Sequence, residues 1–145
     1  MIGLFNIFGT LTSGYFSTKF PKKFILSFIY FMRGLVIVLF IFLPPSPIIT
    51  VLFWITFGFL WLATVPPTAG IVGFIFGTKY MGLLYGIVFL SHQIGSFFGA
   101  YLGGVFKEVY GSYDYAWYVS IALSIFAGLI HLPIREKQVN RLQTA

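Results

Sequence analysis

Residues 24–43 read FILSFIYFMRGLVIVLFIFL, and Arg33 is the only charged residue in this run. An α-helix rises about 1.5 Å per residue, so a helix over this stretch is roughly as long as the hydrocarbon core of a bilayer is thick. The run therefore predicts a transmembrane helix, and its one charge marks the first candidate functional residue.

Four further apolar runs accompany it, at residues 1–16, 48–76, 81–106 and 116–133. They are continuous, whereas strands of a membrane barrel would be short segments of alternating polarity. The predicted fold class is all-α, a polytopic membrane helix bundle of about five transmembrane helices. We expect one transmembrane helical domain over residues 1–134 and a tail over residues 135–145. Because the first run is short for a span, we also expect the chain to be a fragment with a truncated start.

The composition agrees with a chain whose solvent is lipid. Hydrophobic residues make up 59% of the chain, charged residues make up 8%, and the mean hydropathy is +0.95. Soluble domains carry about 25% charged residues. The sequence contains no cysteine and no recognisable catalytic constellation. We therefore predict neither an enzyme, nor a cofactor, nor a metal site.

The basic residues predict the orientation of the chain. They fall on alternate predicted loops and on the tail, so they share one side of the membrane: Lys19, Lys22, Lys23, Lys79, Arg135, Lys137 and Arg141. The opposite side has only Lys107. The positive-inside rule then predicts a cytoplasmic C-terminus and an outside position for Met1. Topology thus accounts for the net charge of +6, and no nucleic-acid partner is expected.

Arg33 needs a partner, because a charge at mid-span costs about 2.5 to 3.5 kcal/mol on insertion scales. None of the three acidic residues lies within a predicted span. Arg33 could pair with backbone carbonyls, with an acid in another part of the protein, or with an anionic substrate. It could also simply lock two helices together, with Ser27, Tyr30 and Gly34 on its broad helix face.

A second feature interrupts the third predicted span. Pro66 and Pro67 lie inside it, next to Thr64, and proline removes a backbone donor and clashes with the preceding turn. The helix must kink or break there. The freed carbonyls and the threonine hydroxyl could line a substrate path, although proline kinks are also common in ordinary membrane helices.

The fourth span has two neighbouring stripes of small residues at four-residue spacing. One contains Ser91, Gly95, Gly99 and Gly103; the other contains His92, Ser96, Ala100 and Gly104. Such stripes are typical of close helix packing. His92 could donate a hydrogen bond across helices or exchange a proton during transport. In the first span, Asn6, Thr10 and Ser13 could face a cavity or bond to their own helix backbone.

The segment between the first two spans resembles a motif of a known family. Residues 14–23 read GYFSTKFPKK, and Gly14, Lys19, Lys22 and Lys23 match the cytoplasmic loop motif of the major facilitator superfamily. In that motif a glycine and three residues are followed by aspartate, a basic residue, any residue, glycine and two basic residues. Thr18 stands at the aspartate position and Pro21 at the second glycine position.

With Arg33, the Thr64–Pro67 segment and residues 82–104, the chain is similar to the monocarboxylate-transporter-like bacterial branch of that superfamily. The resemblance implies helices eight to twelve of a twelve-helix secondary transporter in a bacterial cytoplasmic membrane. It also implies missing N-terminal helices as partners, alternating access, a small organic solute such as a monocarboxylate or other organic anion, and a co-transported proton. The alternative left open is a non-transporting membrane interaction or assembly protein that uses its glycine-rich helix faces.

Overall fold

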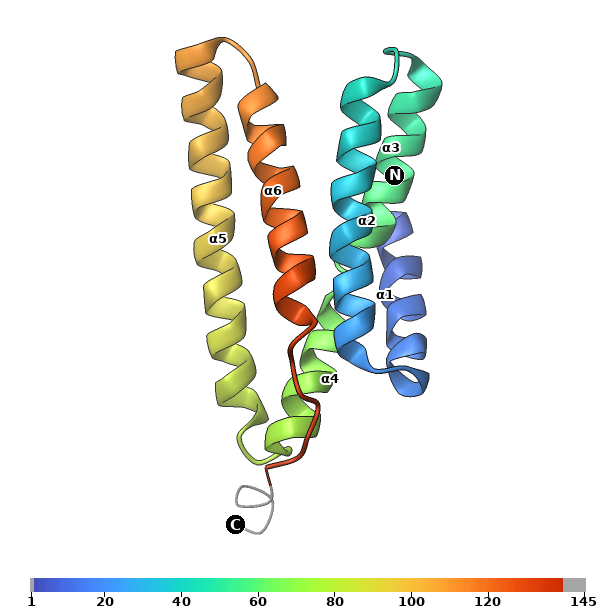
Figure 1. The fold of residues 1–145 in the computed structure, drawn as a ribbon, viewed down its shortest axis with the longest axis vertical. Helices are drawn as coiled ribbons and strands as arrows, with labels where there is room; N and C mark the ends of the chain where they lie inside the picture. Colours follow the sequence, from blue (N-terminus) through green and yellow to red (C-terminus); the bar gives the residue numbers. More distant parts are fainter. Residues whose placement is uncertain (1, 140–145) are drawn as a thin grey trace.

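The computed structural model describes residues 2–139 and contains six α-helices. They are α1 (Ile2–Lys19), α2 (Lys22–Phe42), α3 (Pro47–Trp61), α4 (Val65–Phe76), α5 (Met81–Tyr110) and α6 (Asp114–His131). The predicted all-α class is confirmed (Figure 1). Met1 and Arg141, which entered the predicted orientation, lie outside the described residues.

Three stretches of the described chain are long and apolar enough to cross a membrane. They are α2, the combined stretch Pro47–Phe76 that holds α3 and α4, and α5. Helices α1 and α6, with 18 residues each, are not among them. The lengths and apolar character of these three stretches support a chain that crosses the bilayer several times.

Proline determines where α2 ends and α3 begins. Leu43 precedes Pro44 and is extended, with φ −78° and ψ 146°, because a proline disfavours helical geometry in the residue before it. Ser46 then caps α3, since its Oγ accepts a hydrogen bond from the Ile49 N–H at 3.2 Å. Pro47 occupies the first turn of α3, where it loses no helical hydrogen bond.

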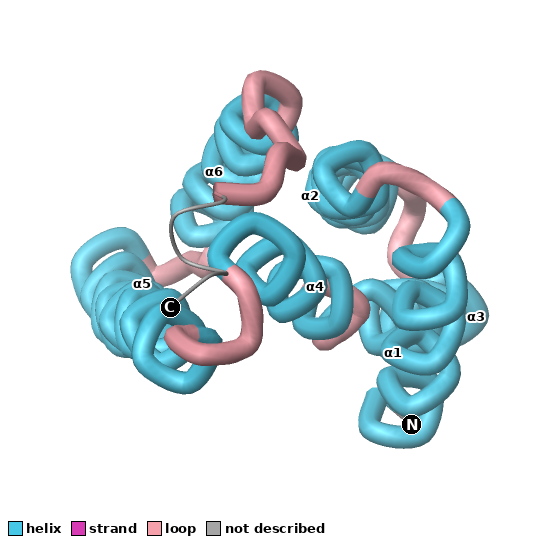
Figure 2. Tube along the Cα trace, turned by 90° about the horizontal axis from the view of Figure 1, so that it is seen from below, coloured by secondary structure: helices cyan, strands magenta, loops and turns pink. Residues whose placement is uncertain are grey.

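The predicted interruption of the third span is confirmed as a full break. Helix α3 ends at Trp61 and α4 begins at Val65. Because Pro66 and Pro67 have no N–H, they cannot donate to the carbonyls of Leu62 and Ala63. They are tolerated only in the first turn of a new helix. Figure 2 shows α4 passing between α5 and the group formed by α1, α2 and α3.

Two predicted loops are shorter than expected. The first was predicted over residues 17–23, but α1 continues to Lys19. Its last polar side chains are satisfied by their own helix, because the Ser17 hydroxyl donates to the Ser13 carbonyl at 2.7 Å and Thr18 donates to Tyr15 at 2.7 Å. The loop predicted over residues 107–115 is reduced to 111–113. Gly111 ends α5 in the left-handed region, at φ +70°.

Helices joined by short loops are not the most closely packed pairs. Helix α2 packs most extensively against α6, and α1 packs against α3. Both contacts use small residues. A Cβ added at Gly9 would lie 1.7 Å from the Phe59 carbonyl oxygen, and the buried Ser27 hydroxyl donates to the Gly128 carbonyl at 2.7 Å. Close backbone approach of this kind drives association of helices in lipid, where apolar surface alone gives no preference.

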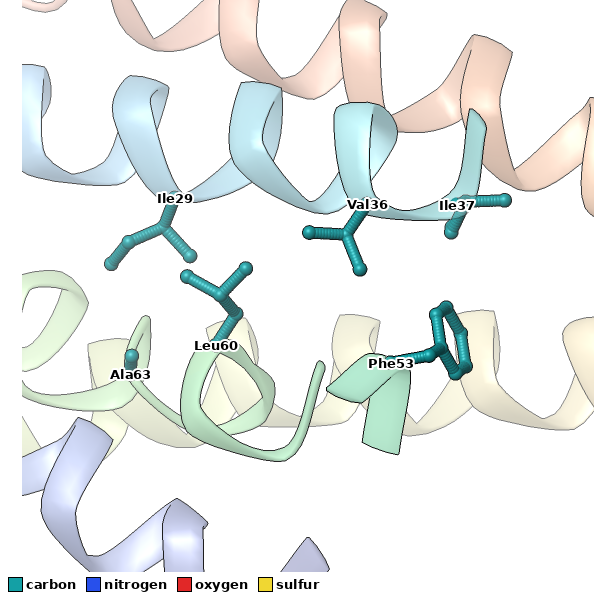
Figure 3. Packing of buried hydrophobic residues seen from close by; sticks show 6 residues of the cluster. All are labelled: Ile29, Val36, Ile37, Phe53, Leu60 and Ala63. Carbon is teal, nitrogen blue, oxygen red and sulfur yellow. The ribbon is translucent and has the colours of Figure 1, made fainter. Parts of the chain in front are cut away.

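The hydrophobic core lies where α2 faces α3 and the start of the break. Figure 3 shows side chains from α2 meeting side chains from the following segment, and the six buried residues are Ile29, Val36, Ile37, Phe53, Leu60 and Ala63. Phe40 stacks on Phe53 with ring centroids 4.1 Å apart. This core holds α2 against the C-terminal end of α3. Arg33 of α2 lies beside that end.

Helix α5 stands apart from the core. None of its residues is buried, and Figure 1 shows it at the edge of the bundle, beside α6. Within the described chain, a Cβ added at Gly95, Gly99, Gly103 or Gly104 would meet nothing within 4 Å. The small-residue stripes therefore pack against no helix in this structure, and close packing at this face stays a prediction.

Candidate functional site

The site is built around the broken end of α3. The last carbonyls of a helix have no partner inside it and carry the negative end of the helix dipole. Arg33, from α2, donates to two of them: Nε and Nη2 lie 3.1 and 2.6 Å from the Leu60 oxygen, and Nη2 also donates to the Trp61 oxygen. Of the partners considered for Arg33, backbone carbonyls are those that it has in the structure.

A second helix holds the same break. The Leu62 N–H donates to the Asn6 side-chain oxygen of α1 at 2.9 Å. The other two polar residues of that face bond to their own helix, since Thr10 donates to the Asn6 carbonyl and Ser13 donates to the Thr10 carbonyl. Side chains from α1 and α2 thus fix the break on both its donor and its acceptor groups.

A cavity of about 420 Å³ adjoins the break. It is lined by Tyr30 and Arg33 from α2, by five residues at the break and the start of α4, by the middle of α5, and by His131 at the end of α6. The five residues are Trp61, Leu62, Thr64, Val65 and Thr68. Its size is typical of a small-molecule site. Five residues predicted from three separate spans line it together: Tyr30, Arg33, Thr64, Ser91 and His92.

Arg33 brings an unneutralised charge to this cavity. Among residues 2–139, no aspartate or glutamate lines the cavity, and the Nη1 group of Arg33 has no hydrogen-bond partner. The guanidinium carbon lies 5.3 Å from the centre of the Tyr30 ring, a favourable but weak contact for a cation. Two N–H groups of Nη1, on a side chain that lines the cavity, are therefore available to an acceptor.

His131 is a cavity residue that the sequence did not indicate. Its ring stacks on Tyr30, with centroids 5.1 Å apart and planes at 27°. Its Nδ1 lies 2.6 Å from the Ala127 carbonyl oxygen, so Nδ1 bears the hydrogen and Nε2 is the acceptor in the neutral ring. His131 and Tyr30 are about a hundred residues apart in the chain, so no local pattern could have joined them.

Trp61 and Phe89 also line the cavity, although neither was predicted as a site residue. In the sequence Trp61 is one aromatic among many in a long apolar run, and in the structure it is the last residue of α3, next to the break. Phe89 lies three residues before His92, and their rings are 6.0 Å apart. Its spacing from His92 is a signal that could have predicted a shared face of α5.

Other predicted site residues lie beside the cavity rather than in its lining. Pro67 is fully buried, and Pro66 lies next to Gly14, where an added Cβ would be 3.7 Å from the proline Cβ. Gly95, Gly99 and Gly103 are further along α5 and do not line the cavity. The prolines thus shape the break, and Gly14 connects it to the predicted loop motif.

Two basic residues of the loop motif, Lys22 and Lys23, connect the start of α2 to neighbouring segments. The Lys23 ammonium donates to the Leu132 carbonyl at 3.2 Å, and the Lys23 N–H donates to Glu136 at 2.8 Å. The Lys22 ammonium lies 5.3 Å from the Phe74 ring of α4, and Lys19 lies 4.5 Å from the Tyr15 ring. The motif therefore ties α2 to α4 and to the segment after α6.

Comparison with known proteins identifies the family. Residues 1–144 match the Major Facilitator Superfamily, which is nearly the whole chain. No curated protein and no solved structure matches it. The family is one of transporters, in keeping with the several membrane-crossing helices and with a cavity between them. The chain belongs to the Major Facilitator Superfamily.

Proposed function

We propose that the chain is the C-terminal part of a secondary transporter that moves a small organic anion, with a carboxylate held by Arg33. The observation that carries this proposal is the cavity itself: among residues 2–139, its lining has one arginine with two free N–H groups and no acidic residue. A guanidinium in a site of low dielectric binds a carboxylate through strong, charge-assisted hydrogen bonds. A monocarboxylate matches the single positive charge.

The broken helix supports a role in transport. In many transporters, discontinuous helices near the midplane form the solute site, because their free backbone groups can face a polar cavity. Here the break between α3 and α4 lies directly beside Arg33. Solute that competes for the guanidinium would loosen its hold on the α3 carbonyls, which couples binding to the geometry of the break. Missing N-terminal helices would close the cavity, and alternating access would expose it to each side in turn.

His92 is the candidate for an accompanying proton. It lines the same cavity as Arg33, and histidine is the side chain whose ordinary pKa lies closest to neutrality. The nearby Ser91 hydroxyl donates to the Val88 carbonyl at 2.7 Å. Ser91 is therefore not free to donate to the solute, and its role is confined to the shape of the wall.

The test is uptake by the full protein reconstituted in liposomes. We expect saturable uptake of at least one small monocarboxylate, and no uptake of the corresponding primary amines or uncharged amides. The charge of the solute decides this outcome, because only an anion compensates Arg33. Uptake that is equal for an acid and its amide would contradict the proposal.

The alternative, a non-transporting assembly protein, is favoured by one observation. The glycine stripes of α5 are uncovered within residues 2–139, so another helix could bind there. This alternative predicts that Arg33→Gln changes assembly and that the protein carries no solute. Solute uptake by the full protein, with its oligomeric state measured in parallel, separates the two functions.

The proposed orientation gives a separate prediction. We expect the C-terminus to lie in the cytoplasm of a bacterium, because the basic residues gather on that side. Green fluorescent protein fused after residue 145 should fluoresce, and alkaline phosphatase at the same place should be inactive. The opposite pair of results is expected for a fusion within residues 111–113. An active phosphatase at the C-terminus would contradict the proposed orientation, because it would place that end outside the cytoplasm.

A further inference from the structure

Aromatic rings lie beside Arg33 in one wall of the cavity. The Arg33 guanidinium lies over Tyr30 at 5.3 Å, and Tyr30 in turn stacks on His131 at 5.1 Å. Tyr30 thus has one flat group from its own helix and another from α6 against it. Arg33 and Tyr30 are three residues apart on a helix, which places them on one face.

Helix α5 presents a second set of rings to the same cavity. Tyr85, Phe89 and His92 all line it, and they follow one another by four and three residues. That spacing puts one ring on each successive turn of a single helix face. Phe89 and His92 are 6.0 Å apart with planes at 34°. The cavity is therefore bounded by ring surfaces from α2 and α6 and by others from α5.

Three of the hydroxyl groups in the lining are engaged within their own helices. Thr68, Ser91 and Ser96 each donate to a carbonyl of their own helix, at 2.7, 2.7 and 3.0 Å. Their hydrogens are used, so they cannot also donate to a second polar group of a solute. Arg33 remains the permanently charged donor among the described lining residues, beside the hydroxyls of Tyr30, Thr64 and Tyr85. The aromatic rings give much of the remaining wall an apolar, flat surface.

We propose that the solute of this site is an aromatic monocarboxylate, a molecule with one carboxylate and a planar ring. This inference rests on the proposed function and names its substrate class. The carboxylate binds the free N–H groups of Arg33, and the ring packs against Phe89 on one side and against the edge of the Tyr30 ring on the other. Aromatic pairs are favoured by their geometry beyond the apolar area that they bury.

The experiment compares two acids of nearly equal size, benzoate and cyclohexanecarboxylate, in liposomes that contain the full protein. Cyclohexanecarboxylate is not planar and has no π-system, although it has at least as much apolar surface. We expect uptake of radiolabelled benzoate and competition by unlabelled benzoate at a concentration about fivefold to tenfold lower than by cyclohexanecarboxylate, from the ring contacts alone. This comparison needs no variant.

Phe89→Leu then tests the wall. Leucine keeps the apolar bulk and removes the ring, so the preference for benzoate should fall to about twofold or less. The matched control is Phe97→Leu, on the same helix, because Phe97 is exposed and does not line the cavity. The Phe97→Leu variant should prefer benzoate over cyclohexanecarboxylate as strongly as the wild type does. If both variants kept the full preference for benzoate, the proposed contact between the Phe89 ring and the solute would be overturned.

Failures of the two proposals are distinguishable. Uptake of butyrate that depends on Arg33, with benzoate neither carried nor competing, would overturn the aromatic class and leave anion transport in place. Equal competition by benzoate and cyclohexanecarboxylate would also overturn it. Absence of uptake for every carboxylate, in protein that remains monodisperse in detergent, would overturn both the substrate class and the proposed function.

Discussion

Replacing Arg33 with glutamine is expected to reduce uptake of the anionic solute by about 30-fold or more, since loss of one partner of a buried charged hydrogen bond costs about 2–5 kcal/mol. Glutamine keeps a donor but has no charge. Uptake by Arg33→Lys should lie between that of the wild type and that of Arg33→Gln, because an ammonium keeps the charge and lacks the planar fork of a guanidinium. Initial rates of uptake, normalised to the amount of reconstituted protein, give the measurement.

The control for this prediction separates binding from structure. Arg33 also donates to the last carbonyls of α3, so its loss disturbs the break as well as the charge. Asn6→Ala disturbs the same break, because Asn6 accepts from Leu62, but it leaves the guanidinium in place. We expect Asn6→Ala to retain most of the uptake. An equal loss in both variants would mean that Arg33 acts only through the break.

The second large effect is expected for Gly9→Ala. The added Cβ would lie 1.7 Å from the Phe59 carbonyl oxygen, a backbone atom that cannot move without separating α1 from α3. We expect a loss of about 3 kcal/mol in stability, at the upper end of overpacking effects, although alanine alone would favour the helix by about 1 kcal/mol. The temperature at which the protein loses monodispersity in detergent gives the measurement.

Gly3→Ala is the matched control for this change. It lies on the same helix, and an added Cβ there meets nothing within 4 Å. It should be neutral or slightly stabilising, because alanine has the higher helix propensity. If Gly9→Ala behaved like Gly3→Ala, the close contact between α1 and α3 would not exist in the membrane.

The fold class followed from the sequence because hydropathy is averaged over many residues. The run around Arg33 gave α2 with its end set by Pro44, and Pro66 and Pro67 gave the break, since their chemistry forbids a continuous helix. The loop bounds were less accurate. Serine and threonine near helix ends can bond to their own backbone, as Ser17 does, and a polar residue then extends a helix instead of ending it.

The pairing of helices could not be predicted from the sequence. Neighbours in the chain are not the most closely packed pairs, since α2 packs mainly against α6 and α1 against α3. These contacts depend on where a glycine meets a backbone, as Gly9 meets Phe59 and Gly58 meets Ile2. Such a match involves two distant segments, and neither segment alone contains it.

The candidate site was predicted in part. Arg33, Thr64 and His92 were singled out for separate reasons, as a charge, a proline-flanked hydroxyl and a titratable group in a span, and the structure places them around one cavity. His131 was missed because it is at a helix end, where a polar residue needs no explanation. Only the stacking of Tyr30 on its ring brings it into the site.

The most direct measurement is calorimetric titration of the purified full protein in detergent with small carboxylates and with their uncharged amides. We expect at least one carboxylate to bind saturably and its amide to bind about 30-fold more weakly or not at all, because the amide cannot neutralise Arg33. In Arg33→Gln this difference should disappear. Discrimination between acid and amide that persists in Arg33→Gln would contradict the account, because the anion would then be recognised elsewhere.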